Sequence, residues 1–298
     1  MKHKMAFVTT VTDAVNFHAV RRLISSIRAF AGEFCQETIL VFTSRDGLDL
    51  SSEDVKVIQA ISPRSIADYP LGEKVVYCSM AEQELRGTFE TMVYVDPYSL
   101  ILRPPRAFQL DAISDVALRP VHLKNIGQPA DEPLSDFWSA LYKLVGIVMP
   151  HFKVVSFVDS CSLYPYFNTH CFSIKPDLGL CQRWMQLLST SILNDSFQDR
   201  LCPDFQNKLF LHQAIFSSLV TAEISQERIR ILPPDYSYPY HLQQEIPPAV
   251  KASVLNDLTH VVYENCSLNP DKIAGIAIHE PLNTWLRQHW LDENSISK

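Results

Sequence analysis

The first hundred residues alternate short β-rich apolar runs with segments of helical periodicity, and this alternation restricts the chain to a small group of folds. The β-like runs are KMAFVTTV, ETILVFTS, VKVIQA and TMVYVD. Between the first two runs, FHAVRRLISSIRAFAGEF carries Val20, Leu23 and Ile27 at the spacing of one helix face. A second helix is expected from Leu71 to Phe89. Repeated strand–helix–strand units predict an α/β fold with a mostly parallel central sheet flanked by helices.

Several classes of function conflict with the bulk properties of the chain. The formal net charge is −7, and the basic residues form no stripe of the kind that binds a nucleic acid polymer. No run approaches the roughly 18 to 20 apolar residues of a transmembrane segment. The opening MKHKMAFVTTVTD is broken by Thr and Asp too early for a signal peptide, and the seven cysteines form no C-x-x-C pair. The expected location is cytoplasmic, with reduced thiols.

Polar residues follow the expected strands of the first third. Thr9, Thr10 and Asp13 end the first strand, and Asp96 ends the fourth. In open α/β sheets, ligands bind beyond the carboxyl ends of the strands, so these side chains are candidates for a nucleotide site. Neither G-x-G-x-x-G nor G-x-x-x-x-G-K-[ST] occurs, so phosphates would need a metal or basic side chains.

Several later blocks, taken in order, resemble one enzyme family. They are YVDPYSLILRPP, PYFNTHCFSIKP, a helix containing HQA, LPPDYSYPYHL and a C-terminal AIH. This order resembles the GT-A fold of nucleotide-diphospho-sugar transferases, in particular the retaining, galactosyltransferase-like branch that includes glycogenin. The resemblance spans most of the chain but leaves out residues 121–160.

The resemblance implies a single GT-A domain over residues 1–298. Within it we expect a nucleotide-binding βαβ part at 1–105, a helical insertion at 106–160 and an acceptor-side part at 161–298.

The metal-binding block of that family is degenerate in this chain. In the family, two Asp side chains of a D-x-D motif hold Mn²⁺ against the donor diphosphate, and Asp96-Pro97-Tyr98 stands at the matching place. Asp96 and His279 are the implied ligands of Mn²⁺ or Mg²⁺. Tyr98 replaces the second carboxylate, and a neutral phenol is a poor ligand for a hard divalent cation.

The other implied site residues fall into two groups. For donor binding, Asn16 and Phe17 match a pair near the uracil, and Lys74 is the nearest basic equivalent of an Arg that reaches the phosphates. For catalysis, Asn168 matches an Asn that faces the donor sugar. His212 replaces an acid near the transferred sugar, and Gln213 beside it is kept.

Two functions remain open from the sequence. The first is a glycosyltransferase that moves a sugar from a nucleotide-sugar donor, UDP-linked by resemblance, to an unknown acceptor. The second is a non-catalytic member of the fold that binds a nucleotide or glycan. Tyr98 favours the second, whereas Asn168, Gln213 and His279 favour the first. Tyr236 and Tyr238 could stack on a sugar ring or pack in the core.

Overall fold

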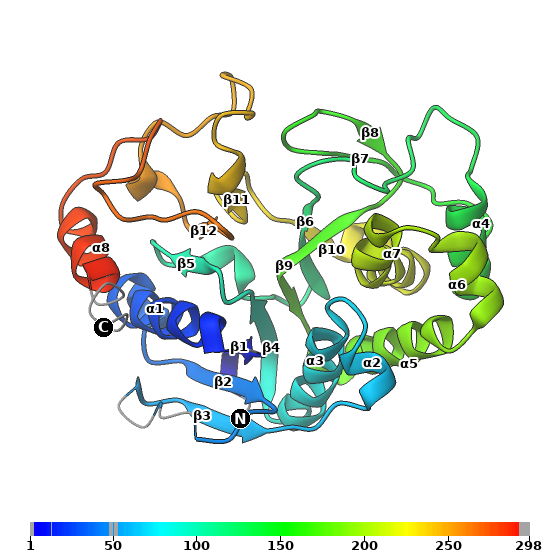
Figure 1. Ribbon diagram of the computed structural model, residues 1–298, viewed down its shortest axis with the longest axis horizontal. Helices are drawn as coiled ribbons and strands as arrows, with labels where there is room; N and C mark the ends of the chain where they lie inside the picture. The colour runs from blue at the N-terminus through cyan, green and yellow to red at the C-terminus, as the bar shows by residue number, and fades with distance from the viewer. Residues whose placement is uncertain (1–2, 13, 48–49, 51–52, 292–298) are drawn as a thin grey trace.

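A seven-stranded sheet forms the centre of the computed structural model, which describes residues 3–12, 14–47, 50 and 53–291 (Figure 1). Strand β9 runs antiparallel to both of its neighbours, and the other neighbouring strands are parallel. The expected α/β class is confirmed, and the arrangement is consistent with a GT-A-like fold. In spatial order the strands are β10 (Ile229–Ile231), β6 (Val116–Pro120), β9 (Phe167–Ile174), β4 (Phe89–Val95), β1 (His3–Val11), β2 (Thr38–Thr43) and β3 (Lys56–Gln59).

Helices cover both faces of this sheet because alternate strand residues are apolar on each side. Met5 and Phe7 of β1 pack with α1 (Ala14–Phe30), whereas Ala6 and Val8 pack on the opposite face. Figure 1 shows α1 on one side and α3 (Gly72–Leu85), α5 (Leu180–Ile192) and α7 (Phe205–Glu223) on the other. Three further helices are α2 (Arg64–Ala67), α4 (Asp136–Leu144) and α6 (Asp195–Leu201).

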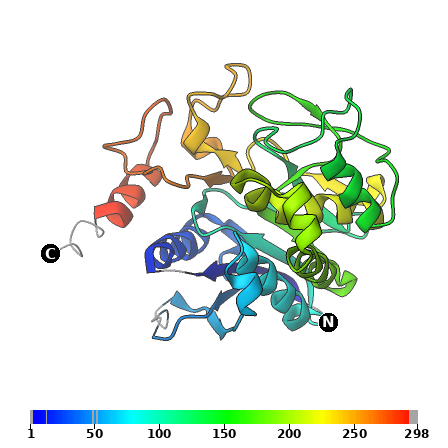
Figure 2. The ribbon, with the colours of Figure 1, turned by 45° about the vertical axis from the view of Figure 1, so that its right-hand side comes forward.

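A smaller sheet lies beside the main one and joins distant parts of the chain. It contains β11 (Tyr238–Pro239), β12 (His260–Val262) and β5 (Ser99–Ile101), with β12 antiparallel to β5. Helix α8 (Leu282–Leu291) packs against it through a shared apolar cluster (Figure 2). Strand β5 comes directly after β4, so the pairing of β12 with β5 places residues from the last part of the chain close to the C-terminal end of β4.

The rest of the regular structure is short. The hairpin of β7 (Val154–Val155) and β8 (Ser162–Leu163) forms a third, two-stranded sheet. In the described part of the chain, no helix is both long and apolar enough to span a bilayer. The 3₁₀ turns include η1 (Gly32–Phe34), η3 (Arg106–Phe108), η4 (Pro176–Leu178), η5 (Gln226–Arg228), η6 (Tyr240–Leu242) and η7 (Leu255–Asp257).

Some expected elements differ from the observed ones. The segment 106–160, expected as a helical insertion, contributes strand β6 to the central sheet as well as α4. The first long helix stops at Phe30 because Gly32 adopts φ +58°, where a Cβ would lie 2.7 Å from Pro104. The helix expected to reach Phe89 ends at Leu85, and β4 begins at Phe89 itself.

Candidate functional site

Two adjoining cavities open beyond the carboxyl ends of β1 and β4. The larger has a volume of about 510 Å³ and the smaller about 260 Å³. Leu71, Lys74, Asp96 and Tyr98 line both, so these residues form the wall between them. The cavities therefore lie where parallel sheets bind ligands.

The smaller cavity is built from the end of β1 and the start of α3. Thr10, Thr12 and Asn16 line it from the first strand and helix. Asn16 is buried, accepts a hydrogen bond from the Thr12 backbone N–H (3.2 Å) and donates to the Thr12 hydroxyl (2.9 Å). These bonds fix the Asn16 amide at the edge of the cavity.

Lys74 supplies a buried positive charge at the wall between the cavities. Its side chain extends from the first turn of α3, and only 5% of the residue is exposed. The ammonium donates to the Thr169 carbonyl (2.6 Å), lies 3.5 Å from Asp96 Oδ2 and sits 4.7 Å from the centre of the Tyr94 ring. Tyr98 N–H in turn donates to Asp96 Oδ1 (3.3 Å). Asp96 thus serves as the counter-ion of Lys74.

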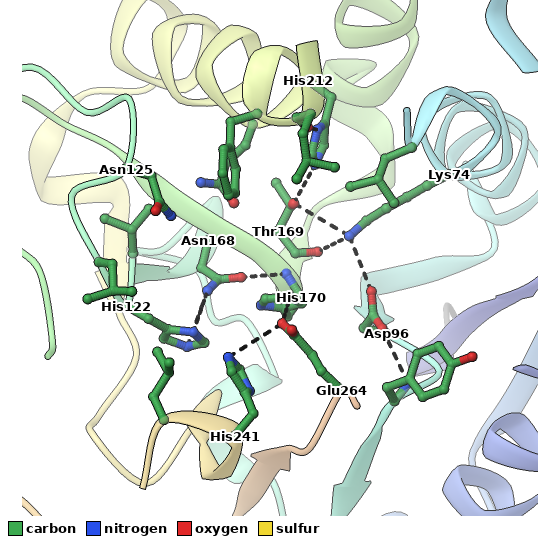
Figure 3. A pocket seen from close by; sticks show the side chains of 18 of the residues that line it. Lys74, Asp96, His122, Asn125, Asn168, Thr169, His170, His212, His241 and Glu264 are labelled. Carbon is green, nitrogen blue, oxygen red and sulfur yellow. Dashed lines mark hydrogen bonds and ion pairs between the residues drawn. The ribbon is translucent and has the colours of Figure 1, made fainter. Parts of the chain in front are cut away.

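The catalytic candidates line the larger cavity above this wall (Figure 3). Nε2 of His122 donates to the Ser237 carbonyl (2.6 Å), so the ring accepts from Asn168 Nδ2 at Nδ1 (3.3 Å). Asn168 also accepts from the His170 backbone N–H at Oδ1 (2.7 Å). Gln213 is buried at the side of the same cavity. The structure therefore brings Asn168, His212 and Gln213 together.

His212 is held as a neutral imidazole. Its Nδ1 lies 2.8 Å from the Leu209 carbonyl, which can only accept, so Nδ1 carries the proton. Nε2 then accepts from the Thr169 hydroxyl (3.0 Å). Burial lowers the pKa of His212 to about 3, and the nearby charge of Lys74 acts in the same direction. Both ring nitrogens are therefore engaged by the protein.

The opposite side of the larger cavity holds residues that the sequence did not single out. His170 Nε2 lies 3.1 Å and His241 Nε2 3.5 Å from Glu264 Oε1, and the rings of His122 and His170 stack at 5.5 Å (Figure 3). Burial alone would raise the pKa of Glu264, but the hydrogen bond and charge of His170, then His241 and Lys74, lower it overall. The sequence did carry a signal for Glu264, because VVYEN is a short apolar strand that ends at an acidic residue, as β4 ends at Asp96.

Comparison with family models gives a match to a Rhodobacterales glycosyltransferase domain over residues 15–222, more than half of the chain. The chain belongs to this glycosyltransferase family. The matched part includes Lys74, Asp96, Asn168 and His212, and it ends before Glu264. No curated protein matched the chain.

Three of the expected site residues line neither cavity. His279 is exposed, and its backbone exchanges hydrogen bonds with the Asn256 side chain (2.8 and 3.1 Å). Thr9 is buried within β1, and Phe17 packs on the α1 side of the sheet. Asp13 falls outside the described residues.

Two tyrosines considered for sugar stacking are core residues. Tyr236 and Tyr238 are 4% and 1% exposed, and neither lines either of the two cavities described above. Tyr236 Oη accepts from the Ala107 N–H (3.0 Å), and Tyr238 Oη donates to Gln243 (2.6 Å).

The residues around Asp96 do not fit the Mn²⁺ or Mg²⁺ site that the resemblance implied. Tyr98 stands at the second carboxylate position, His279 lies elsewhere, and an ammonium already faces the one remaining carboxylate. Over the ranges that the structure describes, no three His, Cys, Asp or Glu residues are grouped to hold a metal ion. The local positive charge comes from Lys74.

Proposed function

We propose that the chain transfers a sugar from a nucleoside-diphosphate sugar, UDP-linked by resemblance, to an acceptor that enters the larger cavity. One observation carries this proposal: the two cavities meet at the buried ammonium of Lys74. The nucleoside would occupy the smaller cavity beside Asn16, and the sugar would occupy the larger one beside Asn168. The diphosphate between them would then cross the wall at Lys74.

Sugar transfer requires that the charge developing on the leaving diphosphate be stabilised. Lys74 is suited to this role because it is buried, where a charge interacts more strongly than in water. It also projects from the N-terminus of α3, whose dipole favours an anion. Lys74 would exchange Asp96 for a phosphate oxygen when the donor binds.

The amides in the larger cavity would orient the donor sugar. Asn168 and Gln213 both line this space, and an amide can donate to one hydroxyl and accept from another. His212 would act differently, because its two nitrogens bond to Leu209 and Thr169. Through Thr169, which also bonds to Lys74, it would position the ammonium.

A non-catalytic nucleotide- or glycan-binding role is the second candidate. It is favoured by Tyr98 in place of a carboxylate and by the existing Lys74–Asp96 pair, which neutralises the wall without any ligand. The two candidates share a donor site and differ in turnover.

Calorimetric titration with UDP, GDP, UDP-glucose and UDP-galactose, each with EDTA or with Mn²⁺, tests the donor site. We expect a uridine nucleotide to bind in EDTA. Lys74→Met should weaken this binding by about 10- to 100-fold, because a hydrogen bond from a charged group contributes about 1.5–3 kcal/mol. Lys56→Met is the control, since Lys56 pairs with Glu84 on the surface and lines neither cavity.

Two results would contradict the proposed donor site: no binding of any nucleotide under either condition, or binding that is unchanged in Lys74→Met. Release of nucleoside diphosphate from the bound sugar nucleotide separates the two candidates. Turnover by the wild type supports the transferase, and tight binding without turnover supports the binding protein.

A further inference from the structure

Glu264 is a carboxylate in the larger cavity to which the proposed donor site gives no role. Both imidazole contacts reach its Oε1, and in the described part of the chain no hydrogen bond reaches Oε2. The side chain is 37% exposed, although the cavity around it is lined mainly by buried residues. One oxygen is therefore held by the protein, and the other is open to a ligand.

The fold carries Glu264 to the reaction side of the cavity. Antiparallel pairing of β12 with β5 places Val262 opposite Ser99, and the Tyr263 N–H donates to the Tyr98 carbonyl (2.9 Å). Glu264 thus comes next to the segment that contains Asp96. Its backbone has φ +42°, a left-handed conformation that costs a non-glycine residue about 1–3 kcal/mol and is concentrated at functional sites.

The Nε2 atoms of two histidines, His170 and His241, face this carboxylate at 3.1 and 3.5 Å. Nδ1 of His170 and Nδ1 of His241 are both buried and have no partner among the described residues. An N–H buried without a partner would cost more than a bare ring nitrogen, so the protons belong on the Nε2 atoms that face Glu264. Two ring N–H groups within 3.5 Å of one oxygen favour the ionised carboxylate.

We propose that Glu264 is the general base of the transfer, with His170 and His241 as its positioning residues. This proposal rests on the proposed function. The acceptor oxygen forms a bond to the anomeric carbon of the donor sugar. The bond from that carbon to the diphosphate oxygen breaks, and its electron pair leaves with the diphosphate at Lys74. The acceptor's hydroxyl proton passes to Glu264 Oε2.

The order of events is consistent with a carboxylate that is ionised at neutral pH. Because the pKa of Glu264 is lowered, the base carries no proton when the acceptor arrives. The acceptor hydroxyl becomes acidic only as its oxygen bonds to the sugar carbon, and the proton moves at that stage. A weak base held in a fixed position can therefore accept this proton.

The first test uses Glu264→Gln, which keeps the shape of the side chain and removes the base. The probe is the sugar nucleotide that binds in the calorimetric titration, with water as acceptor and release of nucleoside diphosphate as the readout. We expect about 100-fold or slower release, in the range that loss of a general base produces. The donor Kd should stay within about twofold. Glu245→Gln is the matched control, since Glu245 is exposed and lines neither cavity.

A second test separates positioning from mere packing. Glu264 is faced by His170 from β9, His241 from η6, Lys74 from α3 and Cys266 from its own loop. His170→Phe removes the donor that lowers the pKa of Glu264. The acidic limb of the pH–rate profile should then move to higher pH, whereas His170→Gln, which keeps an N–H donor, should restore it.

The outcomes distinguish this proposal from the donor site. A wild type that binds no nucleotide refutes the proposed function. A wild type that turns over while Glu264→Gln releases nucleotide equally fast refutes the general base alone. An acidic limb that does not move in His170→Phe refutes the positioning role.

Discussion

A single side chain, Lys74, connects the parts of the candidate site. The residue is 5% exposed, and its ammonium has the Asp96 carboxylate at 3.5 Å and the Thr169 carbonyl at 2.6 Å. Breaking a buried pair of this kind by removing one partner is costly, because an uncompensated charge stays in the interior. Lys74 is therefore stable only with an anion beside it, which Asp96 provides in the absence of a phosphate.

At this scale His212 gives a direct prediction. We expect its imidazole to stay neutral between pH 5 and 8, with the proton on Nδ1, because burial lowers its pKa to about 3 and the Leu209 carbonyl accepts from Nδ1. Nitrogen-15 NMR of the imidazole rings, assigned with His212→Gln, measures both properties. A His212 signal that titrates near 6.5, the value of an unperturbed histidine, would contradict the prediction and the positioning role that depends on a neutral ring.

Among the elements, α5 depends on a residue from another helix. Its N-cap position is Gly179, which has no side chain to cap the first turn. Glu82 of α3 takes this role from a fully buried position and accepts from the Cys181 (3.1 Å) and Gln182 (3.0 Å) N–H groups. A carboxylate at a helix N-terminus also interacts favourably with the helix dipole.

Replacing this cap should cost stability. Glu82→Ala leaves two N–H groups without their partner, and we expect a loss of about 2–3 kcal/mol in the free energy of unfolding. Urea denaturation measures it. Glu84→Ala is the matched control, because Glu84 pairs with Lys56 at the surface and such pairs contribute about 0–1 kcal/mol. Equal losses in the two variants would rule out the capping role.

The sequence predicted individual helices and strands better than it predicted which of them come together at the cavities. The apolar runs of β1, β2 and β4 and the periodicity of α1 gave the α/β class, because each pattern is local. Asn168, His212 and Gln213 were matched block by block, and the structure gathers them at one cavity. Strand β6 was missed because VALRP is short and its five residues are all buried, so it shows no alternation.

The sequence predicted less well which residues of the last part of the chain reach the cavity. The resemblance implied His279 as a site residue, but the strand that reaches the cavity is β12, and Glu264 follows it there. That delivery depends on a three-residue antiparallel pairing with β5, which no periodicity in the sequence encodes.

For the whole molecule, buried histidines should make stability depend on pH. Burial lowers the pKa of His260 and of His212 to about 3 and that of His122 well below its usual value. The unfolded chain binds protons at these positions from about pH 6.5 downward, whereas the folded protein does not. The stability that they contribute is therefore complete above pH 6.5 and is lost as the pH falls toward 3.

Urea denaturation at pH 7 and pH 5 measures this effect. Linkage gives a loss of roughly 2 kcal/mol at pH 5 for each histidine that stays neutral when folded. His260→Phe removes one such group, so its stability should fall less steeply over the same range, whatever its stability at pH 7. An identical slope for the variant and the wild type would contradict the burial argument.

The wall shared by the two cavities also affects how the product leaves. A nucleoside diphosphate bound at Lys74 after the transfer would compete with Asp96, because the Asp96 carboxylate lies 3.5 Å from the same ammonium. We expect recapture of the ammonium by this carboxylate to hasten departure of the nucleotide. Product release would then need no anion from solution. The same competition from Asp96 would lower the affinity for the incoming donor.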